Sequence, residues 1–100
     1  MKKMRVTLLS AAFLGSALSL PASAEDANLG RNLAATCVTC HGKGTGTGTL
    51  DGMAKDRLVQ TMKDFGSGTR PATLMHQLAK GYSEHQVALI AEYFSKQKAK

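Results

Sequence analysis

The residues best suited to chemistry lie in two short segments of the chain. The first, "CVTCH" at residues 37–41, places two thiols three positions apart and an imidazole directly after the second. The second, residues 69–86, contains one thioether, Met75, and two imidazoles, His76 and His85. Thiol, thioether and imidazole side chains are ligands of transition metals. The question is therefore whether these segments hold a metal together.

The spacing C-x-x-C-H is the attachment signature of c-type haem. Cys37 and Cys40 are one helical turn apart, so each thiol can add to one vinyl group of the same haem. His41 is then carried under the ring, where its imidazole can bind the iron. A thioredoxin-like pair would require a βαβ pattern around the cysteines, and a zinc site would require four closely spaced ligands. The sequence predicts one covalently bound haem c.

The second axial ligand of the iron is not fixed by the residues alone. A methionine would raise the reduction potential, because a soft thioether favours ferrous iron, whereas a second histidine would lower it. Met62 lies on the apolar face of a predicted helix, which is more typical of a core residue. The other candidates are Met53, Met75, His76 and His85.

The first 24 residues have the pattern of a secretory signal peptide. Basic residues precede a fifteen-residue apolar stretch, residues 6–20, and "PASA" supplies the small residues that a signal peptidase reads. We expect cleavage after Ala24, leaving one domain, residues 25–100, in the periplasm without stable membrane insertion. A retained membrane helix would require roughly 20 apolar residues and a stop-transfer flank.

Charge and length set further bounds on the mature domain. Losing the three basic residues of the leader lowers the formal charge of +6 to +3. That charge, without a basic stripe, does not favour nucleic-acid binding. A domain of this size usually needs disulfides, a metal or a bound cofactor to be stable, and two cysteines cannot provide a disulfide framework. We expect haem to complete the core and the apoprotein to fold poorly. The final "KQKAK" predicts a solvated tail.

Helical periodicity predicts an all-α chain of three to four short helices, with no strand or second domain. The first helix begins near Asp26, a suitable N-cap, and runs into the "CVTCH" motif. Gly30 inside it costs about 1 kcal/mol relative to alanine, which indicates close approach by another helix. The glycine-rich residues 42–49 predict a flexible turn, because the phosphate-loop pattern is absent.

Two clearer helices follow, with a short helix predicted around residues 72–80. The first of them has an apolar face made of Leu58, Val59, Met62 and Phe65, and residues 66–71 end it. Ser83 and Gln86 form a capping-box pattern at the start of the last helix. Its apolar stripe comprises Val87, Ile90, Ala91 and Phe94.

Residues 37–41, 50–65 and 70–94 together resemble a small class I cytochrome c, in particular the cytochrome subunit of flavocytochrome c sulfide dehydrogenase. This resemblance implies a cytochrome c-like fold around one haem, in which the first and last helices cross and Gly30 lies near Tyr93 or its neighbour Phe94. It also implies that Met75, on a loop before the last helix, is the second axial ligand. His76 stands where many members have proline.

The resemblance further implies outer-sphere electron transfer in the periplasm, through an iron that keeps both ligands. The chain would be the electron-accepting subunit of a sulfide-oxidising flavoprotein and would pass electrons to other cytochromes, without being an enzyme by itself. The alternatives are a free periplasmic carrier and, from another class, a haem sensor or small peroxidase. Arg57, Arg70 and Lys80 are candidate partners of the haem propionates or of an acidic partner protein.

Overall fold

The computed structural model describes residue 15 and residues 26–99, so the predicted signal peptide and its cleavage site lie almost entirely outside the described residues. The described part forms four helices: α1 (Leu29–His41), α2 (Lys55–Ser67), α3 (Met75–Ala79) and α4 (Glu84–Ser95). It contains no strand, which confirms the all-α class. None of these helices has the length and apolar character needed to span a membrane.

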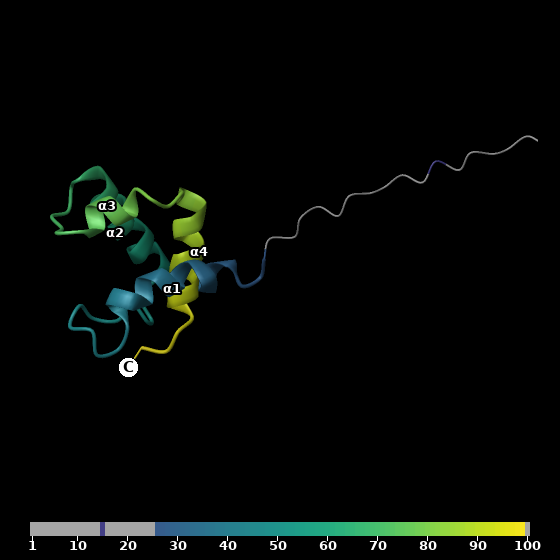
Figure 1. Ribbon diagram of the computed structural model, residues 1–100, viewed down its shortest axis with the longest axis horizontal. Helices are drawn as coiled ribbons and strands as arrows, with labels where there is room; N and C mark the ends of the chain where they lie inside the picture. Colours follow the sequence, from purple (N-terminus) through teal and green to yellow (C-terminus); the bar gives the residue numbers. More distant parts are fainter. Residues whose placement is uncertain (1–14, 16–25, 100) are drawn as a thin grey trace, which may run out of the picture.

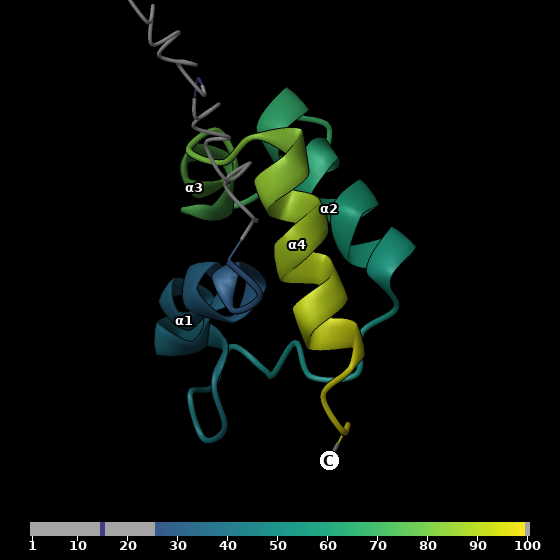
Figure 2. The ribbon, with the colours of Figure 1, turned by 90° about the vertical axis from the view of Figure 1, so that its right-hand side faces the viewer.

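Helix α4 is the centre of the arrangement. It packs against α1 on one side and α2 on another, and α3 packs against α2 (Figures 1 and 2). Helices α1 and α3 do not touch each other. The apolar stripe predicted for the last helix is confirmed, because the buried residues of α4 are Val87, Ile90, Ala91 and Phe94.

The helix ends follow local sequence chemistry, with one correction. Ser83 caps α4, and both hydrogen bonds of the predicted capping box with Gln86 are present. Gly68, at a φ of 80°, ends α2. The prediction of Asp26 as the N-cap of α1 is wrong, since the N-cap is Asn28. Asp26 instead accepts a hydrogen bond from the Asn28 backbone N–H at 2.9 Å, one turn ahead of the helix.

The predicted crossing of the first and last helices is confirmed, but at a different residue. A Cβ atom on Gly30 would lie 2.8 Å from the backbone oxygen of Leu89. The residue opposite Gly30 is therefore Leu89, about one turn before the expected Tyr93 or Phe94. Glycine lets the two backbones approach this closely, which explains a residue that weakens the isolated helix.

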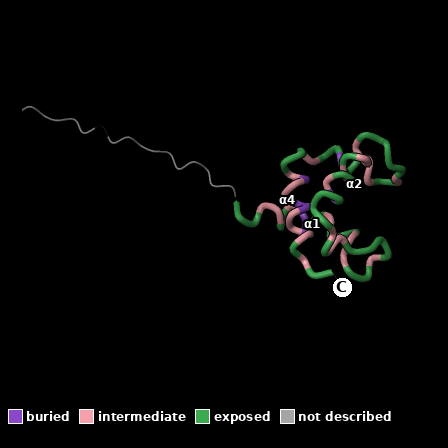
Figure 3. Tube along the Cα trace, turned by 180° about the vertical axis from the view of Figure 1, so that it is seen from behind, coloured by how far each residue is buried: buried purple, intermediate pink, exposed green. Residues whose placement is uncertain are grey.

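The buried core is small for the length of chain. Seven of the described residues are buried, and three of them are alanines (Figure 3). The central cluster joins α1, α2 and α4 through Ala34, Leu58, Ile90, Ala91 and Phe94. Such a core buries little apolar surface, so it needs additional apolar material to be stable.

Candidate functional site

A cavity of about 490 Å³ lies among the helices, next to this small core. Residues from α1, the loop after it, α2, the segment before α3, α3 itself and α4 all line it. The wall is mainly apolar, and Leu74 and Leu78 on that wall are 56% and 42% exposed. The apolar side chains on the wall include Leu50, Met53, Leu58, Met62, Phe65, Leu74, Leu78, Val87 and Ile90.

The three residues of the C-x-x-C-H motif line this cavity together, from the C-terminal part of α1. Cys37 is half-buried and Cys40 is exposed, and no disulfide joins them. Burial raises the pKa of the Cys37 thiol, and a backbone hydrogen bond opposes the shift. The Cys37 sulfur is therefore held as a protonated thiol at neutral pH, in contact with an apolar space.

The imidazole of His41 is oriented by the glycine-rich loop. Its Nδ1 lies 3.1 Å from the backbone oxygen of Gly48. A carbonyl oxygen can only accept, so Nδ1 carries the proton in this hydrogen bond and Nε2 keeps its lone pair. Histidines that bind a metal usually donate their other ring N–H to a backbone oxygen or a carboxylate in this way.

The glycine-rich loop was predicted as a flexible turn with no function, so its contact with His41 is a feature that the sequence reasoning missed. Gly44, Gly46 and Gly48 have φ angles of 73°, 40° and 90°. Positive φ angles are accessible to glycine at little cost. They let the chain turn back so that the Gly48 oxygen reaches His41. The alternation of glycines directly after the histidine was the available signal.

Met75 is the first residue of α3 and lies on the cavity wall, half-buried. It was predicted on a loop, and it stands at the junction between loop and helix. Met53 and Met62 also line the cavity, but both pack against the hydrophobic core, whereas Met75 does not. Of the three methionines on the wall, Met75 is therefore the one whose thioether is not already packed against the core.

The two histidines of the same segment do not line the cavity. His76 has its Nδ1 buried without a hydrogen-bond partner. His85 lies in the first turn of α4 and is exposed. Met75 therefore shares the cavity wall with the motif residues, and the two imidazoles do not.

Arg70 is the one cation among the three expected from the sequence that lines the cavity. Its guanidinium lies over the ring of Phe65, 5.2 Å from the centroid, which fixes its position at the wall. The backbone N–H of Arg70 donates to the backbone oxygen of Asp64 at 3.1 Å. A fixed cation at the wall suits a ligand that carries carboxylates.

These residues fit a haem. The cavity offers a broad apolar surface, two sulfurs one turn apart, an imidazole with a free Nε2, a thioether and a cation for a carboxylate. An all-α chain that gathers a C-x-x-C-H motif and a methionine around such a cavity defines a small haem-binding cytochrome.

Comparison with known proteins gives the family. No protein-family model matches the chain. Cytochrome c-554(548) of Halomonas halodenitrificans is 37% identical over 82 residues, which cover 74% of this chain and 99% of that protein. The cytochrome subunit of sulfide dehydrogenase of Chlorobaculum tepidum is 33% identical over 69 residues, 65% of this chain and 63% of that protein. The thiosulfate dehydrogenase electron acceptor of Thiomonas intermedia is 35% identical over 71 residues, 65% of this chain and 33% of that protein.

The chain belongs to the small c-type cytochromes. The predicted family and the cytochrome c-like all-α fold are thereby confirmed. Membership implies haem c as the cofactor. The chain spans less than two thirds of the Chlorobaculum protein and a third of the Thiomonas protein.

Proposed function

We propose that residues 25–100 form a periplasmic electron carrier with one covalently bound haem. Cys37 and Cys40 would hold the haem by two thioether bonds, and His41 and Met75 would bind its iron. The observation that carries this proposal is that all four side chains line one mainly apolar cavity.

Each residue has a defined task in this proposal. Bound haem supplies one site, the iron, that takes up and releases a single electron. His41 presents Nε2 because its Nδ1 donates to the Gly48 oxygen, and Met75 provides a soft ligand that favours the reduced state. The apolar wall would limit the access of water to the iron, and with His41 and Met75 both bound the iron would not take a substrate as a ligand. The transfer is therefore outer-sphere.

Arg70 is proposed as the partner of a haem propionate. It is the one Arg, Lys, Asp or Glu side chain among the described residues that line the cavity, and its guanidinium stacks on the ring of Phe65. A preorganised guanidinium binds a carboxylate in a bidentate manner at little entropic cost. Arg57 and Lys80, which do not line the cavity, are better placed for an acidic partner protein.

For the electron donor we propose a sulfide-oxidising flavoprotein, with this chain as its electron-accepting cytochrome subunit. The similarity to a protein named as a cytochrome subunit of sulfide dehydrogenase supports this role. The similarity to a thiosulfate dehydrogenase electron acceptor supports a donor of the sulfur-oxidising class more generally. Electrons would pass onward to other periplasmic cytochromes.

A free electron carrier without a permanent partner is the second candidate. The full-length match to cytochrome c-554(548), which covers 99% of that protein, favours it. Native purification with a visible spectrum distinguishes the two roles. Flavin and haem in one stable complex would support the subunit role, and a monomeric haem protein without flavin would support the free carrier.

The same spectrum tests the ligand set. Ferric protein with histidine and methionine on the iron should have a weak methionine-to-iron charge-transfer band at the red end of the visible range. Absence of this band, with an exchangeable sixth position, would favour a haem sensor or small peroxidase. Amino-terminal sequencing of the exported protein tests the cleavage after Ala24.

A further inference from the structure

The C-terminal end of α4 is joined to the loop that follows α1. The backbone oxygen of Phe94 accepts hydrogen bonds from the Gly52 N–H at 2.9 Å and from the Gln97 N–H at 3.1 Å. Figure 2 shows this loop passing beneath the end of α4 on its way to α2. One carbonyl therefore connects the loop, the helix and the tail beyond it.

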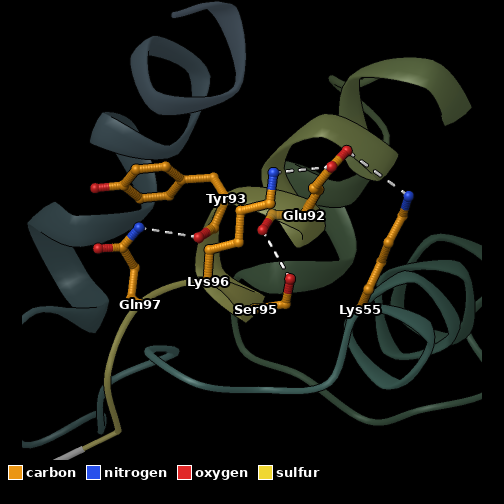
Figure 4. Close-up of polar contacts among 6 residues, drawn as sticks. All are labelled: Lys55, Glu92, Tyr93, Ser95, Lys96 and Gln97. Carbon is orange, nitrogen blue, oxygen red and sulfur yellow. Dashed lines mark hydrogen bonds and ion pairs between the residues drawn. The ribbon is translucent and has the colours of Figure 1, made fainter.

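The tail folds back over this junction. The Gln97 side-chain amide donates to the backbone oxygen of Tyr93 at 3.0 Å (Figure 4). Ala99 packs directly on Gly52, where a Cβ atom would lie 2.7 Å from the Ala99 Cβ and 3.0 Å from its nitrogen. The prediction of a solvated tail holds for the exposed Lys96 and Lys98 side chains, but the backbone is anchored.

The clamped segment is the same turn that orients the motif histidine. Gly48, whose oxygen accepts from His41, lies four residues before Gly52. Within residues 49–53, the Asp51 N–H donates to the Thr49 hydroxyl at 3.1 Å, and the Met53 N–H donates to the Leu50 backbone oxygen at 3.1 Å. These hydrogen bonds restrain residues 49–53, and Gly48 is joined directly to Thr49, so a displacement at Gly52 would be transmitted along a short, restrained segment to the Gly48 oxygen.

We propose that residues 97–99 position the axial histidine, by clamping the turn of residues 48–53 onto α4. The inference rests on the proposed binding of iron by His41. Gly52 and Ala99 act as positioning residues, without touching the haem site themselves. By holding the Gly48 oxygen in place, the clamp preserves the hydrogen bond that keeps the imidazole electron-rich.

The test compares the ferrous holoprotein with a variant that ends at Lys96. The measurement is the solvent-exchange rate of the His41 Nδ1 proton and of the Gly52 amide proton, followed by NMR. Loss of the clamp should speed exchange of both protons by about tenfold, because the free energy of one hydrogen bond corresponds to about that factor. The reduction potential should rise, because a less electron-rich imidazole stabilises ferric iron less well.

A matched pair of glycine substitutions separates the clamp from backbone strain. Gly52 and Gly68 have φ angles of 79° and 80°, but a Cβ on Gly68 would meet nothing within 4 Å. Gly52→Ala should speed exchange of the His41 proton about tenfold, and Gly68→Ala should leave it unchanged. Adding Ala99→Gly to Gly52→Ala removes the Cβ contact and should restore part of the protection.

Two results would overturn the clamp: unchanged His41 exchange in the shortened chain, or equal acceleration in the Gly68→Ala variant. The parent protein is first checked for haem mass and for its charge-transfer band. A parent with no bound haem would overturn the proposed function and the clamp together, whereas a normal haem spectrum with insensitive exchange would overturn the clamp alone.

Discussion

A methyl group added at Gly30 tests how closely α1 and α4 pack. The new Cβ would lie 2.8 Å from the Leu89 oxygen and 3.4 Å from the Leu89 carbonyl carbon. The neighbour is backbone, so it cannot rotate away as a side chain would. Widening the contact from 2.8 Å to an ordinary 3.4 Å requires the helices to separate by about 0.6 Å. That shift loosens the core, which joins the same two helices.

The net cost follows from two opposing effects. Alanine in place of glycine favours the helix by up to about 1 kcal/mol. Overpacking a close helix contact costs roughly 1–3 kcal/mol. We expect Gly30→Ala to destabilise the holoprotein by about 1 kcal/mol, which lowers the melting temperature by about 4–8 °C for a domain of this size. Denaturant unfolding followed by far-ultraviolet circular dichroism measures the change.

Gly66 provides the control, because it is also a helical glycine. It lies in α2, and a Cβ there would meet the Ala79 Cβ at 3.9 Å, an ordinary contact. Gly66→Ala should therefore stabilise the protein, by at most about 1 kcal/mol. Equal stabilisation by Gly30→Ala would refute the close approach of α1 to Leu89 and the helix crossing built on it.

Three further predictions concern the haem site and the surface. Protein with Cys37→Ala and Cys40→Ala, freed of haem, should lack the cooperative far-ultraviolet melt of the holoprotein; a matching melt would contradict the view that haem completes the core. Met75→Ala should remove the charge-transfer band and lower the reduction potential, whereas His76→Ala should keep the band; a band that survives Met75→Ala would assign the ligand to another methionine, Met53 or Met62. Hydrogen bonding to Lys96, with the charges of Lys96 and Lys55, lowers the pKa of Glu92 below 4.5. The contribution of the ionised Glu92 to stability is therefore present above pH 4.5 and is lost as the pH falls through the pKa of Glu92 in the folded protein. Glu92→Gln should slightly lower the unfolding free energy at pH 7 and match the parent in strong acid; an equal deficit at both pH values would rule out the ionised pair as the cause.

Local chemistry explains what could be predicted from the sequence. The capping box at Ser83 and the apolar stripe of α4 depend on residues within one helix, and both are confirmed. The spacing of Cys37, Cys40 and His41 is also local, because one helical turn brings all three to one side of α1. They line a common cavity with Met75, although that residue comes from a different helix.

What could not be predicted depends on contacts between distant segments. The partner of Gly30 is set by how far α4 slides along α1, and periodicity does not fix that register. Positive φ angles in exposed loops accompany two of these contacts. They are the hydrogen bond between His41 and Gly48 and the packing of Ala99 on Gly52. A glycine permits such angles, but its presence in the sequence does not show which atom it will approach. Asp26 was wrongly predicted as the N-cap of α1 because its side chain accepts a hydrogen bond from the Asn28 N–H in a turn that precedes the helix.

Mass spectrometry of the exported protein tests the central claim most directly. The intact mass should equal that of residues 25–100 plus one haem with no atoms lost, since each thiol adds across a vinyl group. After proteolysis, the haem should remain on the peptide that contains Cys37 and Cys40. An exported chain with no added porphyrin mass, or a haem that dissociates when the protein is denatured, would contradict the account.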